Sequence, residues 1–197
     1  MPWTSSAAAL VLLGYLAGSI PFGVLLTRWV RGVDVRQTGS GNIGATNVTR
    51  VAGKKLGAVV LLLDALKGSL AVGLALWLVP EAPRLHAAVG LAAFLGHVYP
   101  VWLKLHGGKG VATALGVLVV LVPLAALSAA LVYAGLVAAW RVSSVGSLAG
   151  GVTAVGLAAV TARAPEYAGL AGLLFLLILW THRGNIHRLW RRTERRF

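Results

Sequence analysis

The chain of 197 residues contains no cysteine and few charged residues. Without cysteine it can form no disulfide, offer no thiolate nucleophile and hold no zinc ion through thiolates. Only 12% of the residues are charged, whereas 58% are hydrophobic, and the mean hydropathy is +0.82. This composition indicates an integral membrane protein.

Signal-peptide features are also missing from the first apolar run, Ala7 to Val30. No basic segment precedes this run and no small-residue cleavage site ends it, so we expect it to be retained as a membrane span. The chain shows no soluble domain, linker, low-complexity segment or internal repeat. We therefore expect residues 1–197 to form a single transmembrane domain.

Helices are the expected way to cross the membrane, because lipid offers no hydrogen-bond partner to an exposed backbone. Several apolar runs approach the ~20 residues that cross a ~30 Å hydrocarbon core. The expected fold is all-α, with about seven transmembrane helices, the N-terminus outside and the C-terminus cytoplasmic. The predicted spans lie at about 7–28, 56–79, 85–103, 111–123, 124–140, 146–162 and 167–181, with one division at Pro123.

The formal net charge of +13 does not indicate nucleic-acid binding, because the basic residues lie in short segments beside apolar runs. This distribution is typical of membrane topology. With the N-terminus outside, fifteen of the eighteen Lys and Arg residues face the cytoplasm, Arg84 and Arg163 face outside, and Lys67 lies within a span. Residues 111–140 could form one tilted helix or two short ones. Two helices would cross the membrane twice and return Arg141 to the cytoplasmic side, where most of the basic residues lie, so two helices are favoured.

The first polar segment is Gly39 to Arg50, GSGNIGATNVTR. Its glycine spacing matches a dinucleotide fingerprint only literally, because a membrane helix rather than a strand precedes it. Glycines let backbone N–H groups converge on an anion, and a following helix N-terminus favours negative charge. We interpret the segment as a phosphate site, the alternative being an ordinary polar loop. The candidate ligands are Gly39, Ser40, Gly41, Asn42, Gly44, Thr46, Asn47 and Arg50.

The second polar segment is Gly96 to Thr113, GHVYPVWLKLHGGKGVAT. It is not a P-loop, because Leu103 and Gly110 stand where that motif needs glycine and a hydroxyl residue. A glycine turn that presents a lysine before an apolar helix is still a good anion site. Its candidate ligands are Gly107, Gly108, Lys109 and Gly110. Lys104 is interpreted as an interface residue, His106 as an exposed loop residue, and His97 as either a structural residue or a ligand.

The third polar segment is Thr181 to Arg196, THRGNIHRLWRRTERR. A run this basic after the last span is typical of an anchor at the lipid surface, which is how we interpret its final arginines. His182 and Asn185, spaced i and i+3 on an emerging helix, share one face and could hold a polar ligand together.

Two smaller features lie within or beside the apolar runs. Asp64 and Lys67, spaced i and i+3, are expected to form an ion pair inside a span, where ionisable residues are either functional or structurally paired. Ser143, Ser144 and Ser147 follow a short inward-facing break. Their hydroxyls could line a cavity or cap the next helix.

In order, and separated by membrane spans, the three polar segments resemble the signature motifs of the bacterial acyl-phosphate:glycerol-3-phosphate acyltransferases, the PlsY family. The resemblance covers essentially the whole chain. It implies transfer of a fatty acyl group from acyl phosphate to the 1-hydroxyl of sn-glycerol 3-phosphate, giving lysophosphatidic acid and phosphate. It also implies a multi-pass enzyme of the bacterial cytoplasmic (inner) membrane that needs no cofactor or metal and binds no nucleic acid. We expect a monomer.

The resemblance also implies roles for individual residues. Ser40 and Arg50 match essential residues, and the segment 107–110 matches a glycerol-phosphate-binding motif. His182 and Asn185 match the histidine and asparagine of the third motif. Two further matches are Ser147, which would lie in the pocket, and Glu194, which would be a structural partner for nearby arginines. One departure is the pair Arg191 and Arg192, where a glycine is common.

An acyl phosphate is already activated, so the site needs mainly to position, neutralise charge and stabilise an oxyanion. We hypothesise that the glycine-loop N–H groups and Ser40 hold the acyl phosphate. Glycerol 3-phosphate would be held by Arg50, Lys109, His182 and Asn185, in a pocket that faces the cytosol. The proton acceptor could be His182 or a substrate phosphate.

Two other classes of protein are consistent with parts of the pattern. Basic groups in a polytopic bundle would also serve a transporter of anionic solutes, but a transporter should show midplane sites at broken helices. A structural lipid-binding subunit would leave the serine, asparagine and glycine motifs unexplained.

Overall fold

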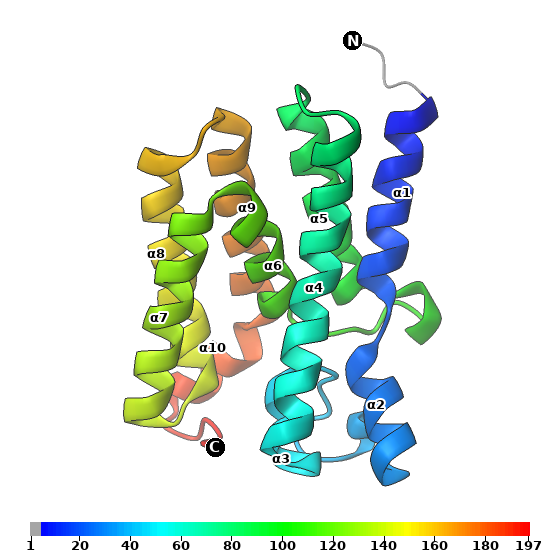
Figure 1. Ribbon diagram of the computed structural model, residues 1–197. Coiled ribbons are helices and arrows are strands. Elements are labelled where there is room, and N and C mark those ends of the chain that lie inside the picture. The colour runs from blue at the N-terminus through cyan, green and yellow to red at the C-terminus, as the bar shows by residue number, and fades with distance from the viewer. Residues whose placement is uncertain (1–4) are drawn as a thin grey trace. The chain divides into compact units, whose positions relative to one another are not determined.

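The computed structural model describes residues 5–197, and every regular element in this range is a helix (Figure 1). The predicted all-α class is therefore confirmed for these residues. The chain divides into two compact units, Met1–Val117 and Leu118–Phe197.

The first unit is built around its longest helix, which contacts the helices before and after it. The elements are α1 (Ser5–Ser19), α2 (Phe22–Arg31), the 3-10 turn η1 (Val35–Gln37), α3 (Ala45–Ala52), α4 (Lys54–Leu78), α5 (Pro83–Val98), the 3-10 turn η2 (Val101–Leu103) and the start of α6 (Val111–Leu121). Helices α1 and α5 pack beside one half of α4, and α2 and α3 pack beside the other half (Figure 1).

Small residues let α1 and α5 approach closely. A Cβ at Gly14 would press on Val89, and a Cβ at Gly18 would overlap the backbone of Ala93. Glycines four residues apart on one helix face are a common means of tight helix association in membranes, where apolar burial alone drives little.

The first apolar run, predicted as one span, is broken into α1 and α2. Pro21 lies at the break, where it offers no N–H and disfavours a helical conformation for Ile20. Helix α2 buries Val24 and Thr27, whereas Arg28 and Trp29 are exposed. The run therefore ends in a separate amphipathic helix rather than in a continuous apolar one.

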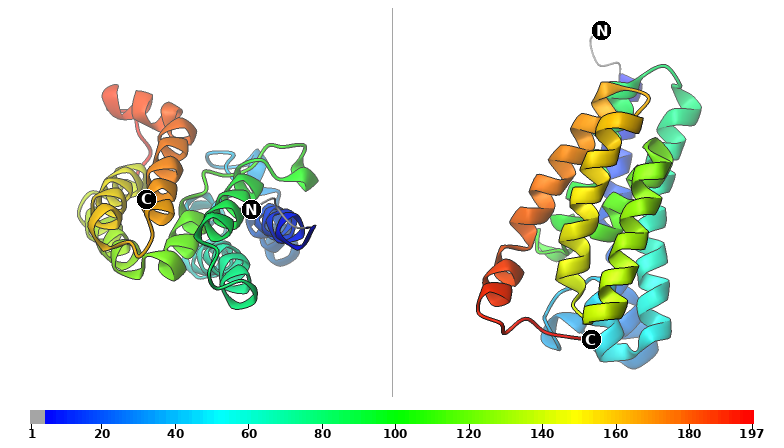
Figure 2. Two further views of the ribbon diagram at one scale, coloured as in Figure 1. Left: turned by 90° about the horizontal axis from the view of Figure 1, so that it is seen from above. Right: turned by 90° about the vertical axis from the view of Figure 1, so that its left-hand side faces the viewer.

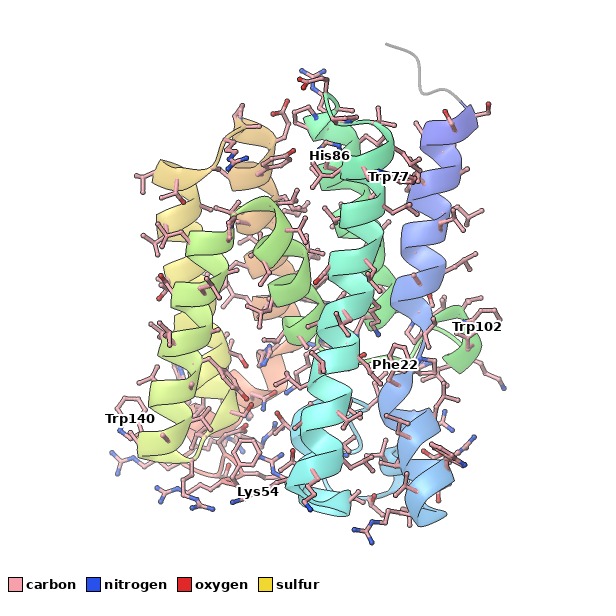
Figure 3. The ribbon with its side chains drawn as sticks, in the orientation of Figure 1. Phe22, Lys54, Trp77, His86, Trp102 and Trp140 are labelled. Atoms are coloured by element: carbon pink, nitrogen blue, oxygen red, sulfur yellow. The ribbon has the colours of Figure 1, made fainter. Side chains whose placement is uncertain are left out.

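Helix α4 has one side that packs against the protein and one exposed apolar side, as expected of a helix that faces lipid. It buries Val60 and Val72 together with the ionisable Asp64 and Lys67, whereas Leu62 and Leu70 are more than half exposed. Figure 3 shows Lys54 at the end of this helix beside α3, with Trp77 at the opposite end. The buried polar pair therefore lies well inside the helix, as its predicted position in a span requires.

The second unit contains the rest of α6 followed by α7 (Pro123–Trp140), α8 (Ser143–Thr161), α9 (Pro165–Thr181) and α10 (Arg183–Trp190). Helix α8 packs against both α7 and α9, and α10 turns away from the axis of α9 (Figure 2). Proline occupies the first position of α7 and of α9, where its missing N–H would have no helical partner. The break at Pro123 confirms that residues 111–140 form two helices.

The number of helices that could cross a membrane is five or six among the described residues, rather than the predicted seven. By length and composition the five are Ser5–Arg31, Lys54–Leu78, Pro83–Leu103, Pro123–Trp140 and Ser143–Thr161. The sixth is the pair α9 and α10, which is bent by 60°. The difference arises at α6, because its 11 residues rise by only ~1.5 Å each and cannot cross a ~30 Å core.

Candidate active site

Asn47 holds the first polar segment in shape from inside. The residue is 1% exposed. Its Nδ2 lies 2.9, 3.1 and 2.9 Å from the carbonyl oxygens of Val35, Thr38 and Asn42, so its two hydrogens are shared among three acceptors. Its Oδ1 accepts the backbone N–H of Ser40 at 2.7 Å. The sequence suggested Asn47 as a donor to an anion, but here its amide serves the loop itself.

The loop runs directly into the N-terminus of a helix, as predicted. Gly39 and Gly41 have φ values of 63° and 73°, which residues with a Cβ rarely adopt. Asn42 Oδ1 accepts the N–H of Gly44 at 2.8 Å, and Gly44 is the N-cap residue of α3. A glycine turn followed by a helix N-terminus is a suitable anion-binding backbone.

The side chains proposed to contact an anion come from both ends of this segment. Ser40 is exposed on the turn, whereas Thr46 in the first turn of α3 and Arg50 in its last turn are half-buried. The segment thus offers backbone N–H groups, hydroxyls and a guanidinium within one loop and one short helix.

A small apolar cluster fixes this loop and helix to the rest of the first unit. Its buried members are Val24, Val35, Ile43, Val48, Ala52 and Val60, drawn from α2, η1, the loop, α3 and α4. Leu103 of η2 packs against the same cluster. The first and second polar segments are therefore neighbours in the folded unit.

Asp34 orders the turn that leads into the loop. Its carboxylate lies 2.6 Å from the guanidinium nitrogens of both Arg28 and Arg36. The hydrogen bond from Arg36 outweighs burial and holds the pKa of Asp34 far below its usual value. This carboxylate therefore stays ionised at any pH near neutrality and cancels part of the positive charge beside the loop.

The second polar segment is a glycine loop tied to the end of α5. The N–H of Gly107 donates to Val98 O and that of Gly108 to His97 O, each at 3.0 Å. Lys109 follows and is half-buried, and α6 begins at Val111. The loop thus presents Lys109 just before a helix, as the sequence predicted.

The residues before the glycine loop project outward. Lys104 and His106 are exposed, and His106 Nδ1 lies 2.6 Å from Lys104 O. Trp102 is exposed on the side of the first unit, at about the level of Phe22 (Figure 3). The interpretation of His106 as an exposed loop residue is confirmed.

In the second unit, His182 lies at the bend between α9 and α10. It is 2% exposed, and its Nδ1 lies 2.9 Å from Ile178 O. Because a carbonyl oxygen can only accept, Nδ1 carries a proton, and the lone pair of the neutral imidazole is on Nε2. The predicted emerging helix is therefore kinked at His182, which ends α9 and precedes α10.

Glu194 gathers three donors around the third polar segment. Its Oε1 accepts from Asn185 Nδ2 and from Ser144 Oγ, the latter at 3.0 Å, and its Oε2 lies 2.7 Å from Arg188 Nε. Burial opposes ionisation, but these hydrogen bonds outweigh it and lower the pKa of Glu194. The predicted arginine partner is present, and Glu194 also fixes Asn185 and α8.

The serines at the start of α8 divide between two roles. Ser144 binds Glu194, whereas Ser147 Oγ donates to Ser143 O at 3.0 Å within the helix. Both Ser144 and Ser147 are buried. The terminal arginines beyond α10 (Arg191, Arg192, Arg195 and Arg196) are exposed, as a surface anchor would require.

Comparison with known proteins agrees with this architecture. The family model described as glycerol-3-phosphate acyltransferase matches residues 8–192. A glycerol-3-phosphate acyltransferase of Myxococcus xanthus (strain DK1622) is 79% identical over 190 residues, which cover 96% of this chain and 99% of that protein. One from Anaeromyxobacter sp. (strain Fw109-5) is 55% identical over 194 residues, covering 95% of this chain and 94% of that one.

Two crystal structures of PlsY (YgiH), an integral membrane glycerol 3-phosphate acyltransferase, share the fold at 41% sequence identity. The glycerol 3-phosphate form has a TM-score of 0.93 and the lysophosphatidic acid form 0.91, each covering 98% of this chain and 96% of that one. Fold and sequence together define an integral membrane enzyme. The chain belongs to the glycerol-3-phosphate acyltransferase family, and the predicted PlsY resemblance is confirmed.

Two features of these sites were not predicted. Asp64 contacts His97 of α5 as well as Lys67, and Glu194 binds Asn185 and Ser144. The only available signal for His97 was a titratable residue inside an apolar run. Asp64 and His97 are 33 positions apart, and Ser144 and Glu194 are 50 apart. Such contacts follow from the packing of the folded chain, which spacing along the sequence does not reveal.

Proposed function

We propose that the protein transfers a fatty acyl group from acyl phosphate to the 1-hydroxyl of sn-glycerol 3-phosphate, giving 1-acyl-glycerol 3-phosphate and phosphate. Membership of a glycerol-3-phosphate acyltransferase family supports the acceptor. The observation that carries the proposal is the loop held by Asn47. This loop places a glycine turn and Ser40 directly before the N-terminus of α3, and α3 carries Arg50 in its last turn. Such a segment suits a phosphate-bearing substrate.

The chemistry requires no covalent enzyme intermediate. The 1-hydroxyl oxygen attacks the acyl carbonyl carbon, the bond between that carbon and the bridging phosphate oxygen breaks, and phosphate leaves with the electron pair. The hydroxyl proton passes to a base. Because the donor is activated, the protein contributes orientation and stabilisation of the oxyanion.

The family resemblance implies how the candidate residues would share these tasks. In the first unit, backbone N–H groups at Gly39, Gly41 and Gly44, with Ser40, would bind the acyl phosphate. Arg50 and Lys109 would neutralise the phosphate of the acceptor. In the second unit, His182, Asn185 and Ser147 would contact the acceptor, with Nε2 of His182 as one candidate base.

The proposed site faces the cytosol of a bacterial cytoplasmic membrane, in a monomer with seven crossings. Helix α6 has only 11 residues, so the glycine loop before it would be recessed from the cytosolic face. Non-helical backbone at membrane depth is tolerated where it lines a water-filled cavity. With the loop recessed, α6 would cross only the part of the membrane that remains beyond the loop. Its short length would then be compatible with a seventh span.

Topology can be tested because the chain has no cysteine of its own. Gln37→Cys and Arg163→Cys introduce single thiols at exposed positions on opposite predicted sides. In intact cells a membrane-impermeant maleimide should label Arg163→Cys and spare Gln37→Cys, and in inverted vesicles the order should reverse. Labelling of both from one side would contradict the seven-span threading.

A donor-swap assay tests the reaction. Detergent-solubilised protein is given glycerol 3-phosphate with acyl phosphate, acyl-CoA or acyl-carrier protein, and phosphate release and acyl product are both measured. Only acyl phosphate should support turnover. Arg50→Ala should lower kcat/KM by about 100- to 1000-fold, the usual cost of one charged donor in such a site. Turnover near that of the unaltered protein would refute the assignment of Arg50.

The proton acceptor is tested by His182→Gln. If Nε2 takes the proton, the variant loses the pH dependence of kcat/KM on the acid side. A pH profile that keeps its shape at reduced rate assigns the proton to a substrate phosphate instead.

One observation favours transport as a second function. The first apolar run is broken between α1 and α2 at Pro21, and Lys67 of a buried ion pair donates to Ile20 O there at 2.9 Å. Broken helices are typical of transporter sites. Phosphate release by detergent-solubilised protein, where no gradient exists, would exclude a purely transporting role. Solute uptake by proteoliposomes without acyl transfer would support it.

A further inference from the structure

Three ionisable side chains meet in the interior of the first unit. Lys67 Nζ lies 2.8 Å from Asp64 Oδ1, and His97 Nδ1 lies 3.5 Å from the same oxygen. All three side chains are only 2–4% exposed. Asp64 and Lys67 belong to α4, and His97 belongs to the last turn of α5. The cluster thus joins two helices through a single carboxylate oxygen.

Lys67 links this cluster to the break in the first apolar run. Its Nζ donates to Ile20 O at 2.9 Å, just beyond the end of α1, and lies 5.8 Å from the centroid of the Phe22 ring at the start of α2. The ammonium therefore neutralises Asp64 and at the same time satisfies a carbonyl at the point where the helix ends.

His97 links the same cluster to the glycine loop. Its carbonyl oxygen accepts the N–H of Gly108 at 3.0 Å. Its imidazole fills the space beside Gly108 so closely that a Cβ there would overlap Nε2. Both the backbone and the ring of His97 therefore fix the residue that directly precedes Lys109.

An ionic cluster in this place is a poor source of stability. Removing two charges from water costs several kcal/mol for each ion, and apolar side chains of similar volume often stabilise as well or better. Ionisable groups inside membrane spans are accordingly rare and tend to serve a function. Here the contacts join α4 to α5, to the residue just beyond the end of α1 and to the glycine loop.

We infer that Asp64, Lys67 and His97 are positioning residues that set the glycine loop and, through Gly108, the place of Lys109. We assign the cluster no step of the acyl-transfer chemistry. Its effect on catalysis rests on the proposed function, in which Lys109 binds the phosphate of the acceptor. Its effect on the position of the loop is independent of the proposed function.

The loop can be observed without any assay of activity. Lys109→Cys gives a unique site for a nitroxide spin label, since the chain has no other cysteine. His97→Ala should sharpen the spectrum of this label, because the loop loses its support. His86→Ala is the matched control: His86 is a fully buried histidine of the same helix whose Nε2 lies 2.8 Å from a backbone carbonyl, at the far end of the unit (Figure 3).

Kinetics give a second measure of the same support. His97→Ala should raise KM for glycerol 3-phosphate and lower kcat/KM by about tenfold to a hundredfold, the scale of a small misplacement of a binding group. KM for the acyl donor should change little. His86→Ala should lower thermal stability without this selective change in KM.

Gly108→Ala tests the contact from the loop side and remains informative if His97→Ala folds poorly. Its φ is not left-handed, so the added methyl group acts through the clash with the imidazole. Gly108→Ala alone should raise KM for glycerol 3-phosphate. In the His97→Ala background the same change should cost almost nothing further, because the ring is gone.

The outcomes separate the inference from the proposed function. If the unaltered protein transfers no acyl group, the proposed function fails, and the spin label still decides the role of His97. An unchanged label spectrum in His97→Ala would overturn the inference. So would a Gly108→Ala penalty that persists in full without the imidazole, because Gly108 would then act independently of the cluster.

Discussion

Asn47 in the first unit and Glu194 in the second both fix a polar segment, by opposite chemical means. Asn47 is neutral and donates to three backbone carbonyls of its loop. Glu194 is an anion and accepts from Asn185, Ser144 and Arg188. One residue satisfies carbonyls, whereas the other, in the tail, gathers donors from α8 and α10.

The proposed function offers a reason for this difference at the first loop. A carboxylate inside the first loop would repel the phosphate that its glycine turn is suited to hold, whereas an amide holds the turn without charge. The second segment carries several arginines, so an anionic centre neutralises charge as well as orienting Asn185. We therefore expect the hydrogen bonds of Asn47 to be insensitive to acid and those of Glu194 to be lost in acid.

Asn47→Ala should produce the largest effect. It leaves the N–H of Ser40 and carbonyls of the loop without their partner, and each such group that water cannot reach costs about 1–3 kcal/mol. The loop should lose its shape, with a lower melting temperature and loss of acyl transfer. Both are measured on detergent-solubilised protein.

Asn42→Ala is the matched control, because it removes only the bond to the N–H of Gly44. It should cost about 1 kcal/mol, the value of one ordinary hydrogen bond. Equal destabilisation by the two variants would mean that Asn47 is not the centre of the loop.

Glu194→Gln should have the next largest effect. The variant keeps the shape of the side chain but removes its charge, and bonds to charged groups contribute about 1.5–3 kcal/mol. Thermal unfolding should shift downward, and acyl transfer should fall because Asn185 is no longer oriented. Glu81→Gln, at an exposed position between α4 and α5, should change neither. Full activity in Glu194→Gln would show that Asn185 is positioned by other contacts.

Acid provides a comparison of the two units without mutation. The pKa of Glu194 in the folded protein lies below its ordinary value of 4.5, so its contribution is fully present above that value and is lost as the pH falls below it. The melting temperature of the unaltered protein should therefore drop below about pH 4.5, and that of Glu194→Gln should drop less. The acid sensitivity that remains should come partly from Asp34, whose pKa is also lowered. Identical dependence of the melting temperature on pH in the two proteins would show that Glu194 does not contribute to the acid sensitivity.

Much of the fold could be predicted because its signals are local. Apolar runs predicted the helices, and Pro123 predicted the division of residues 111–140. Spacing of i and i+3 on one helix predicted the ion pair of Asp64 and Lys67. These inferences need only the geometry of a single helix.

Other features depend on contacts that the chain makes only when folded. The sequence shows an amide at Asn47, but not that its Nδ2 turns inward to Val35, twelve positions away. The contact between Asp64 and His97 requires the packing of α4 on α5. The break at Pro21 had a local signal, yet hydropathy alone treats the whole run as one span.

Ser144→Ala should give the smallest effect and the finest test of the Glu194 centre. It removes one of three donors to the carboxylate, which should cost about 0.5–1.5 kcal/mol. Thr153→Ala, in the same helix, removes a hydroxyl that bonds only within α8, to Ala149 O, and should change stability by less. If Glu194 holds α8 to the tail, the cost of Ser144→Ala should disappear in the Glu194→Gln background. A cost that persists there would show that Ser144 stabilises α8 by another route.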